Sequence, residues 1–97
     1  RVDLTVDVEY GTDSDQAKEL LMKIIKEDSR ILDAPAVPFV ALSALRDSSI
    51  QFTVRVWVKS EDYWSVYYDT LEKIYKQLPQ HGIQFPFPQL DINIKQN

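Results

Sequence analysis

The 97-residue chain contains no cysteine, one histidine and only two glycines. The absence of cysteine excludes disulfide bonds, thiol catalysis and cysteine-ligated metals. With Gly11 and Gly82 as its only glycines, the chain has no Gly-rich loop that would cradle a phosphate. No apolar run approaches the roughly 18 residues of a membrane-spanning helix, and no signal peptide is visible. Thiol enzymes, proteins with cysteine-ligated metals, proteins with Gly-rich phosphate-binding loops and membrane-spanning helices are therefore excluded for this stretch.

Positive charge is also scarce: 11 Lys and Arg face 15 Asp and Glu, for a net charge of −4. Nucleic-acid binding depends on clustered Lys and Arg, and the chain has no basic stripe, so we expect no nucleic-acid partner. His81 adjoins Gly82 at the end of a helical pattern, which favours a cation near a helix C-terminus over a catalyst. Without a nucleophile–base set, we expect no enzyme activity, no cofactor and no metal site.

Hydrophobic periodicity predicts the elements. Apolar and polar residues alternate over 2–10 and 50–58, which indicates strands with one buried face. A third strand is predicted over 39–45, and amphipathic helices over about 14–28 and 60–78. With a short strand at 83–85, the order is β-α-β-β-α-β, which predicts a ferredoxin-like α+β sandwich. The predicted buried residues are Val6, Val8, Leu20, Leu21, Ile24, Phe52, Val54, Val56, Leu71 and Ile74.

Helix boundaries carry their own signals. Thr12, Asp13 and Ser14 are candidate N-caps of the first helix, and Ser60 is the candidate N-cap of the second. Pro79 predicts that the second helix ends or bends near Leu78. Gly82 is the expected residue just beyond that helix, with Ile83 folding back as its hydrophobic partner.

The outer face of the first strand is acidic, because Asp3, Asp7 and Glu9 alternate with its apolar residues. Residues i and i+4 of a strand lie roughly 13 Å apart, which is too far to share one cation. A solvated acidic face is therefore favoured over a metal site.

The last residues predict a segment that pairs with other chains. Prolines at 86 and 88 fix an extended spacer, after which apolar and polar residues alternate over 90–95. We therefore divide the chain into an α+β domain, 1–88, and an assembly strand, 89–97. The predicted assembly interface comprises Phe85, Pro86, Phe87, Pro88, Gln89, Leu90, Ile92 and Ile94.

Three motifs together carry a resemblance: DSSIQFTVRVW at 47–57, DYWSVYYD at 62–69 and GIQFPFPQ at 82–89. The pattern resembles the C-terminal cytoplasmic domain of small-conductance mechanosensitive channels. The strand and helix at the start and the loop KEDSRIL at 26–32 fit as well, so the resemblance covers essentially the whole chain. Pro79 is the one local departure from the pattern.

The resemblance implies a homoheptameric channel of the bacterial inner membrane that releases osmolytes during hypo-osmotic shock. This domain would form a vestibule on the cytoplasmic side, and the last strands of seven copies would close a parallel barrel. Asp3, Asp7 and Glu9 become candidates for the vestibule lining. The chain begins on Arg1, so we expect a longer parent whose preceding segments provide the membrane helices. A different class stays open: a soluble ferredoxin-like regulatory module that binds a small ligand at an oligomer interface.

Overall fold

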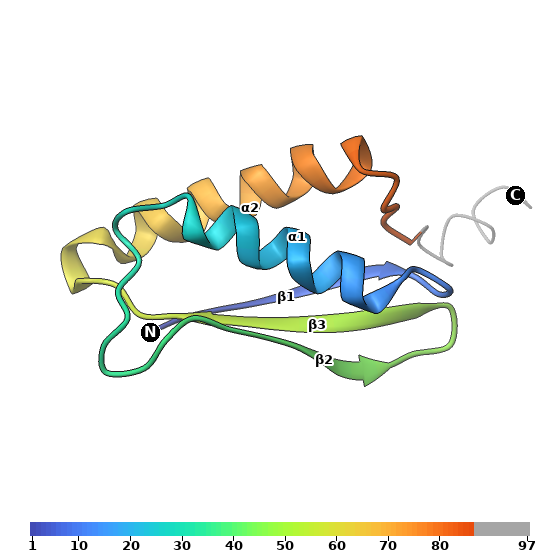
Figure 1. Cartoon of the computed structure of the whole chain (residues 1–97), viewed down its shortest axis with the longest axis horizontal. Coiled ribbons are helices and arrows are strands. Elements are labelled where there is room, and N and C mark those ends of the chain that lie inside the picture. Colours follow the sequence, from blue (N-terminus) through green and yellow to red (C-terminus); the bar gives the residue numbers. More distant parts are fainter. Residues whose placement is uncertain (87–97) are drawn as a thin grey trace, which may run out of the picture.

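The computed structural model describes residues 1–86, which form three strands and two helices in the order β-α-β-β-α. The elements are β1 (Val2–Glu9), α1 (Ser14–Lys26), β2 (Phe39–Leu45), β3 (Ser49–Val56), a 3-10 turn η1 (Ser60–Asp62) and α2 (Tyr63–Gln80). The strands form an antiparallel sheet in the order β1-β3-β2. Both helices cover the same face of this sheet (Figure 1). The predicted α+β sandwich is confirmed.

The core lies between that sheet face and the helices. The apolar set of β1 pairs in register with the apolar set of β3: Val6 lies opposite Phe52, and Leu4 opposite Val54. Because side chains alternate along a strand, this register places every buried apolar side chain of both strands on the helix side. Helix α1 covers them with residues spaced three and four apart: Ala17, Leu20, Leu21, Ile24 and Ile25.

The segment after α2 returns to the end of β1. Gly82 has a φ of +79°, and the N–H of Ile83 donates to the carbonyl of Leu78 at 3.0 Å. The N–H of Gly82 donates to the carbonyl of Pro79, so the turn is a Schellman motif. Ile83 and Leu78 are both buried, which confirms the predicted hydrophobic partnership across this turn.

One backbone hydrogen bond joins this segment to the sheet: the N–H of Glu9 donates to the carbonyl of Gln84 at 2.9 Å. Gln84 therefore lies beside β1 on the side opposite β3, where a ferredoxin-like sheet has its fourth strand. The predicted strand 83–85 reaches this position, but residues 83–86 are not in strand conformation. The predicted C-terminal strand, 89–97, lies outside the described residues.

Leu71 was predicted to be buried and is not: 43% of its surface is exposed. The core-facing stripe of α2 consists of Val66, Thr70, Ile74 and Leu78, which follow one another at intervals of four. Leu71 lies on the flank of this stripe, toward the outer side of the helix. The other nine predicted core residues are buried.

The predicted start of α2 needs correction, and its end lies two residues beyond Leu78. Ser60 does not cap it, because residues 60–62 form the turn η1 and the helix begins at Tyr63 without a side-chain cap bond. Pro79 lies inside the helix, which continues to Gln80. Its missing N–H removes a single hydrogen bond in the last turn, where the Schellman bonds bind nearby carbonyls. At α1 the predicted cap is confirmed, since the Asp13 side chain accepts from the N–H groups of Asp15 and Gln16.

Strand β2 has the predicted bounds, and none of its residues is fully buried. It is an edge strand, and its pairing with β3 shifts register between Leu42 and Ala44, which leaves Ser43 as a bulge. Phe39, Leu42 and Leu45 have exposed fractions of 45%, 42% and 71%.

Two leucines of α2 provide a matched test of this packing. Leu78→Ala should lower the free energy of unfolding of the chain by about 2–5 kcal/mol, because it leaves a cavity in the core. Leu71→Ala should cost about 1 kcal/mol or less in an unassembled copy, because its side chain is largely solvated. Urea unfolding monitored by circular dichroism measures both. Equal losses would contradict the described orientation of α2.

Candidate assembly surface

Helix α2 carries a second apolar stripe that faces away from the core. Trp64, Tyr68, Leu71 and Tyr75 are spaced by four, three and four residues, so they line one side of the helix. Their exposed fractions run from 43% to 70%. Trp64 stacks on Tyr68 at a centroid distance of 5.8 Å, which orders the aromatic part of the stripe. A contiguous exposed apolar patch of this kind is typical of an interaction surface.

Beside this stripe runs a groove of about 680 Å³ between α2 and β1. Its floor is the edge of β1, its wall is the outer flank of α2, and Phe85 closes one end. The lining residues are Thr5, Val6, Asp7, Tyr68, Leu71, Glu72, Ile74, Tyr75 and Phe85. Asp7 and Glu72 are the only charged residues among them, and both are acidic.

The predicted assembly segment starts at this groove. Phe85 packs against the core, and its ring lies parallel to that of Tyr75 at a centroid distance of 6.3 Å. Pro86 follows and is half-buried. The remaining predicted interface residues lie outside the described part of the chain: Phe87, Pro88, Gln89, Leu90, Ile92 and Ile94. Only the first two members can therefore be placed, and both lie at the end of the groove or next to it.

The three acidic residues of β1 lie on the open face of the sheet, but arginines offset part of their charge. Asp3 pairs with Arg1 at 3.0 Å and with Arg55 of β3 at 3.7 Å. Asp7 Oδ1 lies 3.9 Å from Arg46 Nε; this oxygen is buried and accepts no hydrogen bond within residues 1–86. Glu9 is exposed at the end of the strand. The open face is thus a mixed-charge surface and not the purely acidic one that β1 alone suggests.

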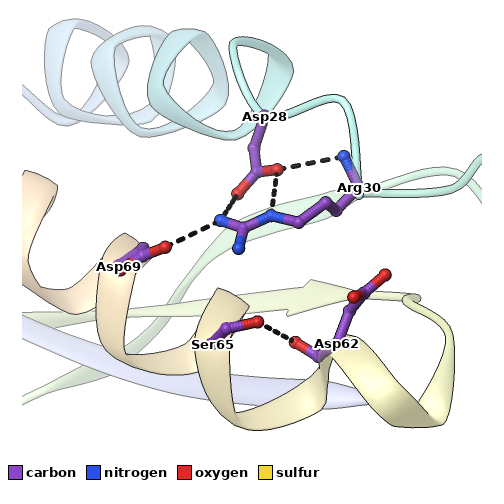
Figure 2. A network of polar contacts seen from close by, with 5 residues as sticks. All are labelled: Asp28, Arg30, Asp62, Ser65 and Asp69. Carbon is purple, nitrogen blue, oxygen red and sulfur yellow. Dashed lines mark hydrogen bonds and ion pairs between the residues drawn. The ribbon is translucent and has the colours of Figure 1, made fainter.

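A polar network ties the loop after α1 to α2 (Figure 2). The guanidinium of Arg30 donates to both carboxylate oxygens of Asp28, at 2.9 and 2.7 Å, and to Asp69 of α2 at 3.0 Å. The backbone N–H of Arg30 also donates to Asp28. Asp28 is 8% exposed, so the network holds a nearly buried carboxylate by direct hydrogen bonds.

These contacts shift the pKa values of both partners. The hydrogen bonds from Arg30 favour the charged carboxylate and lower the pKa of Asp28, against the opposing effect of burial. The hydrogen bonds to Asp28 and Asp69 raise the pKa of Arg30 in turn. Both groups are therefore charged at neutral pH, and the network is an ion pair that fixes the loop.

Within residues 1–86 the side chains do not gather into a catalytic or metal-binding arrangement. This part of the chain has no group of three or more His, Cys, Asp and Glu residues placed to hold a metal ion. His81 Nδ1 lies 3.0 Å from the carbonyl of Gln77, in the last turn of α2. None of the described helices is both long and apolar enough to span a membrane. What the geometry offers is a binding surface.

Comparison with known proteins identifies the family. A family model described as "Mechanosensitive ion channel MscS, C-terminal" matches residues 2–85. The chain belongs to the MscS family. It is 38% identical over 96 residues to a small-conductance mechanosensitive channel of Edwardsiella ictaluri, covering 99% of this chain and 33% of that protein. It is 41% identical to an uncharacterized MscS family protein of Synechocystis, covering 99% and 32%.

The fold agrees with a solved structure of the same family. The crystal structure of Helicobacter pylori MscS in its closed state matches with a TM-score of 0.81 at 28% identity, covering 91% of this chain and 35% of that chain. The chain spans about a third of the length of the MscS relatives it matches. The MscS family is a channel family and not an enzyme class, which fits the expectation of no catalysis.

The sequence contains a signal for the outer stripe of α2, because the 4-3-4 spacing of Trp64, Tyr68, Leu71 and Tyr75 marks a stripe distinct from the core-facing one. The groove had no such signal, because its two sides lie more than 60 residues apart.

The Asp28 network predicts a specific pH dependence. Asp28→Asn should lower the free energy of unfolding at pH 7 by about 1.5–3 kcal/mol, as expected for hydrogen bonds to a charged group. A lowered pKa stabilises the fold at pH values above the unfolded value of about 3.9, and this contribution is lost as pH falls through the folded value. The difference between the parent chain and the variant should therefore shrink below about pH 4. Urea unfolding at a series of pH values measures it.

Asp69→Asn is the matched control, because Asp69 binds the same guanidinium from a solvent-exposed position. Its cost should stay below about 1 kcal/mol. A larger loss for Asp69→Asn than for Asp28→Asn would contradict the assignment of Asp28 as the main partner.

Proposed function

We propose that this chain is the vestibule and assembly domain of a mechanosensitive channel that releases osmolytes on hypo-osmotic shock. The observation that carries the proposal is the family match over residues 2–85, on a chain about one third as long as its relatives. The parent protein lies in the bacterial inner membrane through segments that precede this domain, which faces the cytoplasm. The domain itself performs no catalysis and binds neither nucleic acid nor a cofactor.

The partner of the domain is the same domain of other subunits, in a homoheptamer. Residues 1–88 form the vestibule wall, and residues 89–97 contribute one strand each to a parallel barrel. The exposed stripe of α2 and the position of Phe85 at the groove support self-association. The sequence over 90–95 supports the barrel, since its alternation would place Leu90, Ile92 and Ile94 on one side of a strand.

Energetics explain why the assembly strand needs its neighbours. Burying three apolar side chains contributes roughly 5–9 kcal/mol at about 1.5–3 each. Ordering six residues costs about 6–12 kcal/mol at roughly 1–2 each. The two terms nearly cancel, so the hydrogen bonds of adjacent strands and the high local concentration in a tethered assembly decide the outcome.

The parent protein tests the function directly. Reconstituted in lipid patches, it should open under membrane tension and run as a heptamer in native mass spectrometry. Ile92→Asp should reduce the heptamer fraction and the number of active channels, because it places a charge on the apolar side of the barrel strand. Asn93→Asp adds the same charge on the other side and should leave both near the parent level. A tension-insensitive parent would refute the channel, and an intact Ile92→Asp heptamer would refute the barrel.

The vestibule lining is tested by charge neutralisation in the parent channel. Replacing Asp3, Asp7 and Glu9 by Asn, Asn and Gln should raise the anion-to-cation permeability ratio, because Arg46 and Arg55 then dominate the open face. The shift should be larger at low salt, since screening weakens at low ionic strength. Neutralising the exposed residues Asp15, Glu19 and Glu27 on or next to α1 is the matched control. Equal permeability ratios in the two variants would show that the acidic residues of β1 do not line the ion path.

A further inference from the structure

The groove occupies the place of a fourth strand. Gln84 pairs with Glu9 at the end of β1, and an antiparallel strand would next place Pro86 opposite Asp7. Proline has no N–H, so it cannot donate to the Asp7 carbonyl, and Pro88 repeats this defect two residues later. Within residues 1–86, the pairing of the chain's own C-terminal segment with β1 therefore ends at Gln84.

As a consequence, β1 offers a free edge along the groove. The N–H of Glu9 points away from β3, toward Gln84, and alternate residues of a strand point the same way. The N–H and C=O groups of Asp3, Thr5 and Asp7 therefore face this edge. Within residues 1–86, Glu9 is the only residue of β1 whose outward-facing backbone groups form backbone hydrogen bonds, to Gln84 and Thr12. Above the edge lie Tyr68, Leu71 and Tyr75, exposed apolar side chains that a fourth strand would cover.

At the opposite edge of the sheet, β2 also combines an unpaired strand edge with exposed apolar side chains. It is the other edge strand, and its exposed apolar residues include Leu42 and Leu45. These two pair with Phe52 and Ile50, whose side chains are in the core, so both lie on the helix side of the sheet. Helix α1 leaves them partly uncovered.

The charges of the two edges are compatible. Residues 34–45 contain no ionisable side chain, and the first one after them is Arg46. The charged residues of the groove, Asp7 and Glu72, are both acidic.

We propose that the groove between β1 and α2 receives strand β2 of a second copy of this chain. The strand adds to the β1 edge, as in β-augmentation, and its Leu42 and Leu45 pack against Leu71 and Tyr75. The two surfaces lie at opposite edges of one sheet, so the contact is head-to-tail and each copy uses both. The inference rests on the proposed function in one respect: neighbouring copies must be held close together. Phe85, where the assembly segment begins, lines the same groove and directs neighbours to it.

Cysteine trapping tests this arrangement, because the chain has no cysteine of its own. Leu71→Cys marks the groove and Leu42→Cys marks β2, each with one thiol. The two 97-residue variants are mixed at about millimolar concentration, comparable to that of a short tether, and oxidised. A disulfide requires Cα atoms within about 7 Å, so it reports a specific contact. The mixed dimer should exceed either self-dimer by about tenfold, the preference that about 1.4 kcal/mol provides.

Glu19→Cys, on the exposed face of α1, gives the background yield with each partner. Variants whose urea midpoint falls below that of the parent chain are replaced by Tyr75→Cys and Leu45→Cys, which are more exposed. Dominant self-dimers, or a mixed yield at background, would overturn the proposal. Preferential capture of Leu71→Cys by Ile92→Cys would also overturn it, because the tail would then fill the groove. Tension-gated currents in the parent protein are recorded separately: normal currents without the mixed dimer refute this contact alone, and absent currents refute the proposed function.

Discussion

The width of the sheet is the constraint on which the rest of this structure depends. Strands lie about 4.8 Å apart, so the outer strands of a three-stranded sheet are only about 10 Å apart. Two helices packed side by side, each about 10 Å across, need a wider support. Helix α2 therefore overhangs β1, and its flank remains uncovered although the side facing the core is fully packed. The exposed stripe, the groove and the free edge of β1 all lie where residues 1–86 provide no fourth strand.

This constraint also explains what the sequence could predict. Strict alternation in β1 and β3 predicts their buried faces, because a strand has only two sides. Asp13 and Gly82 mark helix ends through local hydrogen bonds and a positive φ, which are properties of a few adjacent residues. Such features need no knowledge of the tertiary structure, and all of them agree with the structure.

The features that the sequence did not predict depend on contacts between distant parts of the chain. Leu71 follows the same apolar spacing as its neighbours, and only the number of strands below it decides whether it is covered. The bulge at Ser43 depends on pairing with β3, and the Asp28–Arg30–Asp69 network joins a loop to a helix 39 residues further along. Pro79 predicts an end or a bend near Leu78, and α2 continues to Gln80 because the last turn of a helix tolerates the loss of one N–H. The groove, like these, depends on long-range geometry, and its role could not be inferred from periodicity.

The free edge of β1 has a consequence for a copy that has no neighbours. An unpaired strand edge is a template for uncontrolled pairing, and soluble proteins protect such edges with charged side chains. Asp3, Asp7 and Glu9 stand along this edge, so two β1 edges that approach each other bring like charges together. Strand β2 carries no charged side chain, so its approach to the same acidic residues causes no charge repulsion. In the proposed contact, the β1 edge would therefore disfavour pairing with a second β1 edge and accept the uncharged β2.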